Sequence, residues 1–306
     1  MGCNKACVVL MVVCWFSKFN VYTTNQFSSE FKLCESFLTY ISSNCPNNGP
    51  NSYCHYWCCQ RHWLSTRSPF SKSKSSLDFG RSFSATPNFH LIIGDVSKAE
   101  TWQNVIEKAK EIHLPISHLI NCAGVIRPGF LVDYAISDID YHLDINTKGS
   151  ILGTTIIGRE MKFQEFGHII NVSSLAGLAP VSGLSLYVAS KFAVRGFSLA
   201  VASELREFGV DVSVICPDLV NTPMLDLQLN YPEEAKLTFS GPSKTLQPED
   251  LVREILKLMA NPKIQVTVPA SRGLLAKIAG AWPAFAEIFR NSLEKKGRKN
   301  LQKLRK

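Results

Sequence analysis

Short apolar runs alternate with longer segments of helical periodicity between about residues 88 and 270. Branched aliphatic side chains dominate the runs, which is typical of strands buried on both faces of a parallel sheet. The predicted strands are His90–Gly94, His118–Gly124, His168–Ile170, Asp211–Pro217 and Ile264–Pro269. The predicted helices are Ala99–Ile112, Ile139–Met161, Phe192–Phe208 and Gln247–Met259. This alternation predicts an α/β fold with a doubly wound parallel sheet.

The first 85 residues do not follow this alternation. Eight of the ten cysteines lie within the first 59 residues, and the apolar run Val8–Phe16 is far too short to span a bilayer. The cysteines and histidines of Cys54–His62 lack the paired spacing of zinc sites, so we expect no metal site. We divide the chain into an atypical cysteine-rich segment (1–85), an α/β domain (86–270) and a C-terminal extension (271–306).

The most informative polar pattern follows the predicted strand His168–Ile170. Ser174 comes first, Tyr187 lies thirteen residues later, and Lys191 follows after four more. Residues at i and i+4 share one face of a helix, so we expect the Lys191 ammonium to lower the pKa of the Tyr187 phenol. The phenol could then exchange a proton with the oxygen of a carbonyl or alcohol substrate, and the Ser174 hydroxyl could hydrogen-bond the same substrate oxygen. A chance surface pair is the alternative for Tyr187 and Lys191 alone.

This stretch resembles the strand-serine and Y-x-x-x-K signature of the short-chain dehydrogenase/reductase family. The resemblance covers about residues 88–269 and implies a Rossmann-like oxidoreductase that uses NAD(P)(H), with NADP slightly preferred, on a small carbonyl or alcohol substrate. It implies that Ser174 orients the substrate, that Tyr187 is the acid–base, and that Lys191 activates the tyrosine and binds the cofactor ribose. Asn146 resembles the family asparagine whose distorted backbone holds a water near the lysine; an ordinary helical asparagine is the alternative.

Other strand ends resemble the family's cofactor contacts. Asp95 and Val96 would border the adenine, although Asp95 or Ser97 could instead cap the following helix. Asn121, Ala123 and Gly124 would lie beside the adenosine ribose, where a glycine lets the backbone approach a ligand closely. Near the nicotinamide, Pro217 and Thr222 match residues of the family, and Asp218 stands where the family often has glycine. The implied cofactor-binding set is Asp95, Val96, Asn121, Ala123, Gly124, Tyr187, Lys191, Pro217 and Thr222.

The family's glycine-rich phosphate loop is missing from the N-terminal segment, so we expect the sheet to be incomplete at its N-terminal βαβ unit. If the codons are read one nucleotide out of frame, the segment can encode the missing loop. The shifted codons spanning Trp57–Cys58 and Trp63–Leu64 must both encode glycine, and the codons around them permit V-I-V-I-T-G-A-A-S-G-I-G. This pattern favours an out-of-frame or mis-spliced segment over an authentic cysteine-rich extension.

The C-terminal extension is first apolar and then basic. Leu274–Leu293 could pack on the substrate lid expected at Leu225–Leu246, form the face of a homo-oligomer, or lie on a membrane surface. We expect the tail Arg290–Lys306 to be a solvated helix end, and we expect no nucleic-acid partner although the net charge is +8. The chain is interpreted as a cytoplasmic oxidoreductase. The alternatives are a catalytically impaired relative without cofactor binding and a membrane-associated lipid-ketone reductase.

Overall fold

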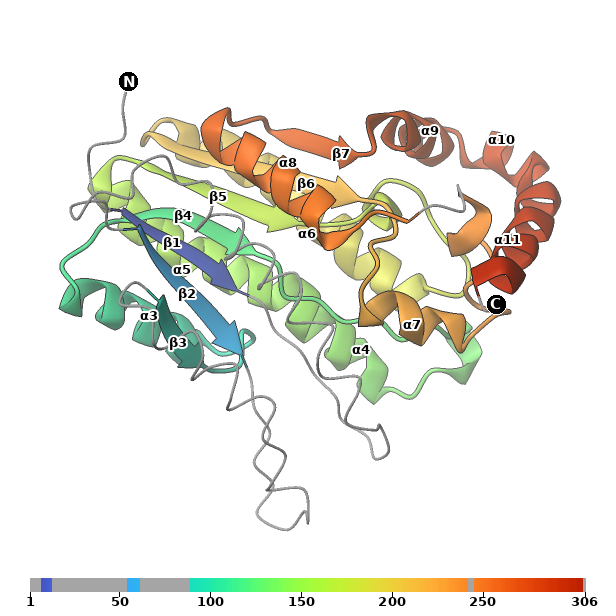
Figure 1. Ribbon diagram of the computed structural model, residues 1–306, viewed down its shortest axis with the longest axis horizontal. Helices are drawn as coiled ribbons and strands as arrows, with labels where there is room; N and C mark the ends of the chain where they lie inside the picture. Colours follow the sequence, from blue (N-terminus) through green and yellow to red (C-terminus); the bar gives the residue numbers. More distant parts are fainter. Residues whose placement is uncertain (1–6, 13–53, 61–88, 242–244, 305–306) are drawn as a thin grey trace, which may run out of the picture.

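A seven-stranded parallel sheet forms the centre of the molecule (Figure 1). The computed structural model describes residues 7–12, 54–60, 89–241 and 245–304. Its strand order is β3-β2-β1-β4-β5-β6-β7, so the order reverses between β1 and β4, as in doubly wound sheets. The strands are β1 (Cys7–Val12), β2 (Cys54–Gln60), β3 (Phe89–Ile93), β4 (Ile116–Asn121), β5 (Gly167–Val172), β6 (Val210–Pro217) and β7 (Gln265–Val268).

Helices cover both faces of the sheet. One face packs against α3 (Ala99–Glu111), α5 (Gly149–Gln164) and α6 (Ser185–Arg206), and the other against α8 (Pro248–Ala260). Neighbouring strand residues divide between the two cores because side chains alternate along a strand. Leu119 and Ile169 lie in the core with α5, whereas Ile120 and Ile170 lie in the core with α8. The remaining helices are α4 (Ser137–His142), α7 (Pro223–Leu229), α9 (Ala270–Ala281), α10 (Pro283–Ile288) and α11 (Arg290–Leu304).

The structure confirms the doubly wound parallel sheet, and each strand expected from residue 88 onward is present. The expected gap at the N-terminal end of the sheet is not found, because β1 pairs with both β2 and β4. The strands β1 and β2 both come from residues 1–85, the segment that we placed outside the α/β domain. The connection between them, residues 13–53, lies outside the described residues, so the domain boundary at residue 86 stays a prediction.

The helix expected over Ile139–Met161 is interrupted. The helix α4 passes into a π-helical turn, η2 (Leu143–Lys148), before α5 begins. A π turn inserts one extra residue per turn and is common at functional sites. Here it holds Asn146, whose side chain is fully buried.

The C-terminal tail is not the solvated helix end that was expected. The helix α11 packs on residues 231–241, and Gly297 lies so close to them that a Cβ would stand 1.7 Å from the Lys236 carbonyl oxygen. The buried Asn300 amide donates to the carbonyl oxygens of Phe239 (2.9 Å) and Gly241 (3.0 Å), and Leu301 joins Phe239 in an apolar cluster. The extension is therefore part of the folded domain.

Candidate active site

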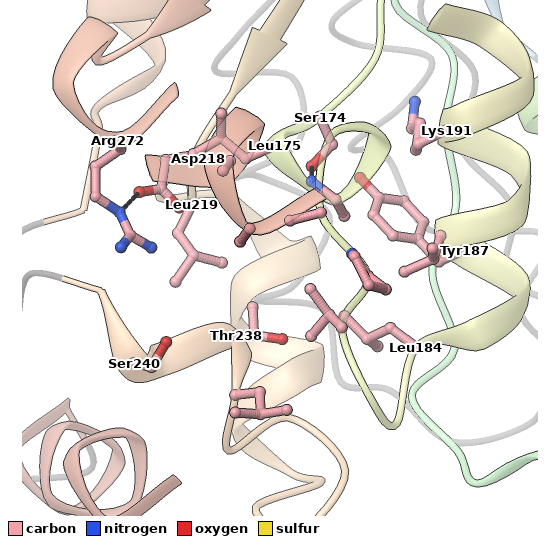
Figure 2. A pocket seen from close by; sticks show the side chains of 18 of the residues that line it. Ser174, Leu175, Leu184, Tyr187, Lys191, Asp218, Leu219, Thr238, Ser240 and Arg272 are labelled. Atoms are coloured by element: carbon pink, nitrogen blue, oxygen red, sulfur yellow. Dashed lines mark hydrogen bonds and ion pairs between the residues drawn. The ribbon is translucent and has the colours of Figure 1, made fainter. Parts of the chain in front are cut away.

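A cavity of about 1080 Å³ opens at the carboxyl ends of β5 and β6 (Figure 2). Parallel strands place their carboxyl ends at one edge of the sheet, where ligands of such folds bind. The central strands supply one wall through Ser174 and Pro217, and α6 supplies another through Tyr187 and Lys191. The expected lid segment and the C-terminal helices complete the enclosure, with Leu225, Gln228, Leu237, Thr238, Leu275 and Phe285 among their lining residues.

Ser174 is held by the turn that follows β5. Its backbone is extended, and its Oγ accepts a hydrogen bond of 3.1 Å from the backbone N–H of Ala176, which caps the short 3-10 helix η3 (Leu175–Gly177). Because the oxygen is the acceptor in this bond, the Ser174 hydroxyl proton can point into the cavity. The local fold thus fixes where the hydroxyl lies without using up its donor.

Tyr187 lies in the first turn of α6, and only 8% of its surface is exposed. Burial raises the pKa of the Tyr187 phenol to about 12, although a hydrogen bond with Ser174 lowers it in part. The lowered pKa that we expected from Lys191 is therefore wrong for this structure, because desolvation of the phenolate dominates. The phenol is protonated at neutral pH.

Lys191 lies one turn further along α6 and is 3% exposed. Its Nζ donates a hydrogen bond of 2.9 Å to the carbonyl oxygen of Val172 at the end of β5, and it lies 5.8 Å from the centroid of the Tyr187 ring. Burial lowers the pKa of Lys191 to about 8. The ammonium is thus fixed between the strand end and the tyrosine, and it ionises much nearer to neutrality than an exposed lysine.

Asn146 reaches the same region from the π turn. Its Oδ1 accepts from the backbone N–H of Val125 (2.7 Å), and its Nδ2 donates to the Val125 carbonyl oxygen (3.0 Å) and to the Ser190 hydroxyl (2.9 Å). Gly124 lies between Asn146 and Lys191, since a Cβ there would stand 3.4 Å from Lys191 Nζ and 3.6 Å from Asn146 Oδ1. The side chain of Asn146 thus joins the segment after β4 to α6, behind the lysine.

The residues expected to bind a cofactor fall into two groups. Gly124, Tyr187, Lys191, Pro217 and Thr222 line the cavity, whereas Asp95, Val96, Asn121 and Ala123 do not. Val96 and Ala123 are buried in the core against α3 and α5. Asp95 Oδ1 accepts from the backbone N–H (3.1 Å) and the hydroxyl (2.8 Å) of Ser97, and neither residue is the N-cap of α3, which is Lys98.

Asn121 forms part of a buried polar network between the central strands and the helices. Its Nδ2 donates to Asn171 Oδ1 (2.7 Å) and to Thr154 Oγ1 (3.2 Å), and Asn171 in turn donates to the Ser198 hydroxyl (2.9 Å). A buried amide that lost these partners would cost about 1–3 kcal/mol of stability. The network therefore fixes β4 and β5 beside the cavity without lining it.

One polar pair in the cavity wall was missed by the sequence analysis. Asp218, at the end of β6, accepts a hydrogen bond of 3.0 Å from Nε of Arg272 on α9, and both side chains line the cavity (Figure 2). The only hint in the sequence was that Asp218 stands where the family often has glycine. Its partner could not be identified, because the two residues are 54 positions apart in the sequence.

A family model described as short chain dehydrogenase matches residues 79–230. A 3-alpha-(or 20-beta)-hydroxysteroid dehydrogenase from Mycobacterium bovis is 38% identical over 132 residues, which cover 43% of this chain and 51% of the relative. A 3-ketodihydrosphingosine reductase from Mus musculus is 33% identical over 156 residues, covering 51% of this chain and 47% of the relative. The chain thus spans about half the length of these curated relatives.

The fold is similar to a solved structure described as ElxO with NADP bound. The two share 18% sequence identity and superpose with a TM-score of 0.65 over 86% of this chain and 96% of the other. At this identity the likeness concerns the fold.

Proposed function

Because the chain belongs to the short-chain dehydrogenase/reductase family, we propose that it transfers a hydride between NAD(P)(H) and a small carbonyl or alcohol substrate, with Tyr187 as the acid–base. One observation carries the proposal: Ser174, Tyr187 and Lys191 line a single cavity at the carboxyl edge of the sheet. The Ser174 hydroxyl lies within hydrogen-bonding reach of the Tyr187 phenol, so both groups can donate to one substrate oxygen. A carbonyl oxygen placed between them can accept two hydrogen bonds.

In the direction of reduction, Tyr187 donates its phenolic proton to the carbonyl oxygen while Ser174 donates a hydrogen bond to the same atom. A raised pKa suits this step, since burial keeps the phenol protonated until the substrate oxygen develops negative charge. The Lys191 ammonium then stabilises the phenolate that remains. Its lowered pKa also makes Lys191 able to return a proton to the tyrosine.

The nicotinamide end of the cavity suits a cofactor. Gly124 leaves open the space beside Lys191 Nζ that a Cβ would take, and Pro217 and Thr222 line the same cavity after β6. We assign the nicotinamide and its ribose to Gly124, Tyr187, Lys191, Pro217 and Thr222. A bound nicotinamide supplies or accepts the hydride. Whether NADP is preferred over NAD stays a prediction.

A catalytically impaired relative is the second candidate, and one observation favours it. The sequence after β1 contains no glycine before Gly49, so a glycine-rich phosphate loop is missing where the family has one. Without backbone N–H groups that cradle the phosphates, cofactor affinity would be low. Cofactor binding and turnover must therefore be measured separately.

The decisive experiment compares the full chain with Tyr187→Phe. NADPH and NADH are titrated by the change in nicotinamide fluorescence, and turnover is followed with a panel of ketones. We expect the variant to keep most of its cofactor affinity, because the phenyl ring still lines the cavity and the other four assigned residues are unchanged. It should lose about 10²–10⁴-fold in kcat, because the proton donor is gone. Thermal unfolding is the control for folding.

Two results would contradict the proposal. Near-wild-type kcat in Tyr187→Phe would exclude the tyrosine as the acid–base. A wild-type chain that is folded but binds neither nucleotide would instead identify an impaired family member.

A further inference from the structure

The helix α9 has its small residues inside and its large apolar residues outside. Gly273 and Gly280 face the domain, where Cβ atoms would stand 1.9 Å from Thr267 Oγ1 and 2.0 Å from the Leu178 carbonyl oxygen. Leu274 and Ile278 lie on the exposed side, with 61% and 38% of their surfaces accessible. A helix that only packs on a core shows the opposite arrangement.

The exposed apolar surface continues beyond α9. Trp282 is 64% exposed at the junction of α9 and α10, and Phe285, Ile288 and Phe289 are exposed along α10 and just after it. Figure 1 shows α9, α10 and α11 following one another at the end of the sheet to which the strands point. We call this surface the C-terminal apolar face; it comprises Leu274, Leu275, Ile278, Trp282, Phe285, Ile288, Phe289 and Leu293.

Positive charge accompanies this face. Residues 270–304 contain eight lysines and arginines but only two acidic residues, Glu287 and Glu294. Both acids are paired, each with Arg290, and Glu294 also with Lys236. By contrast, Lys277, Lys295, Lys296 and Lys299 are exposed and form no ion pair with any other described residue. Helices that carry both exposed apolar side chains and uncompensated lysines match the headgroup region of an anionic bilayer.

The same face borders the candidate active site. Leu275, Ile278, Phe285, Phe289 and Leu293 are exposed and also line the cavity that contains Tyr187, whereas Leu274, Trp282 and Ile288 are exposed and do not line it. A compound that leaves a bilayer at this face would thus reach the cavity along apolar side chains.

We propose that the C-terminal apolar face docks on an anionic phospholipid surface, so that the cavity faces the bilayer. Among the described helices, none is long and apolar enough to cross a membrane. The apolar side chains enter the headgroup boundary, and the lysines of α9 and α11 contact the lipid phosphates. The implied substrates are carbonyl or alcohol compounds that partition into bilayers; this last point rests on the proposed function, whereas docking does not.

Co-sedimentation of the full chain with vesicles tests the docking. We expect binding to phosphatidylcholine vesicles that contain phosphatidylserine, weaker binding to phosphatidylcholine alone, and loss of binding in high salt. The triple variant Leu274→Ser, Trp282→Ser, Ile288→Ser should lose at least about tenfold in vesicle affinity, since each substitution removes an exposed apolar side chain that the bilayer would bury on docking. These residues do not line the cavity, so activity on a water-soluble ketone should stay unchanged.

Phe163→Ser is the matched control. Phe163 is 86% exposed, but it lies in the last turn of α5, which precedes β5 and is therefore at the opposite edge of the sheet. This variant should bind vesicles as the wild type does, and so should Tyr187→Phe, because docking does not depend on the chemistry.

Three results would overturn the docking proposal. Vesicle binding could be absent, or it could be equal in the triple variant and the wild type. Sedimentation analysis could also show a wild-type dimer that the triple variant converts to a monomer without vesicle binding, in which case a second copy of the chain covers the face. Vesicle binding without turnover on any ketone would leave docking intact and reject only the proposed function.

Discussion

At the scale of single residues, burial determines the ionisation of the candidate active site. Tyr187 and Lys191 are enclosed by α6, by the end of β5 and by the segment after β4, so each is shifted toward its neutral form. In the proposed reaction, the phenol with its raised pKa donates the proton, and the amine with its lowered pKa replaces it. The sequence pattern predicts that the two residues are close. It does not predict how deeply they are buried or in which direction burial shifts the pKa of Tyr187.

The lowered pKa of Lys191 has a consequence for stability. Between its folded value of about 8 and the unfolded value near 10.5, the unfolded chain binds more protons, so this residue makes stability rise with pH. Tyr187 acts in the opposite direction between about pH 10 and its folded value of about 12. We expect the free energy of unfolding, measured in urea, to rise more steeply from pH 8 to pH 10 in the wild type than in Lys191→Met. Equal slopes would contradict the burial of a titrating lysine.

At the scale of elements, α9 is positioned by glycines that allow it to touch the domain. Gly280→Ala would place a methyl group 2.0 Å from the Leu178 carbonyl oxygen, so α9 must move and the cavity wall with it. We expect a loss of about 1–3 kcal/mol in the free energy of unfolding, as for other overpacked sites. Urea denaturation measures this loss.

Gly196→Ala is the control for the same substitution in a different setting. Gly196 lies within α6, and a Cβ there would meet no atom within 4 Å. Alanine should stabilise this exposed helical position by about 0.5–1 kcal/mol. If both variants shifted stability alike, close packing of α9 would not explain the glycine at position 280.

Local periodicity was enough to predict most of these elements, because β4, β5 and β6 each carry a pair of adjacent aliphatic core residues: Leu119–Ile120, Ile169–Ile170 and Val214–Ile215. It was also enough to bring Ser174, Tyr187 and Lys191 to one cavity, since two of them share a helix and the third ends the strand before it. Sequence patterns did not predict that Asp218 pairs with Arg272 or that α11 packs on Phe239 and Gly241. Those contacts join distant segments, and nothing local in either partner specifies the other.

At the scale of the whole molecule, the N-terminal segment has the strands of the family fold but not its glycine-rich loop. The strands β1 and β2 occupy the sheet positions between β3 and β4, although the segment lacks the glycines that usually follow the first strand. A pairing of parallel strands requires only extended backbone, whereas phosphate binding requires a particular loop. The sheet can therefore be complete without a complete cofactor site.

The frame-shift hypothesis makes a separate prediction about this segment. We expect the coding DNA across residues 45–90, read one nucleotide out of phase, to contain the two glycine codons that Trp57 and Trp63 force and a hydrophobic strand before them. Transcript sequencing measures this directly. Homogeneous transcripts that support the printed frame, together with tryptic peptides from residues 31–61 in the native protein, would end the hypothesis.

The ion pair between Asp218 and Arg272 joins a strand end to a helix that is synthesised 54 residues later. Domains begin to fold from their N-terminal side during synthesis. In the nascent chain, Tyr187 and Lys191 therefore exist before α9, which adds its part of the cavity wall only after residue 270 has been made. A chain that stopped at residue 269 would lack α9, α10 and α11, so Asp218 would lose its Arg272 partner and the cavity would lose the wall that these helices form.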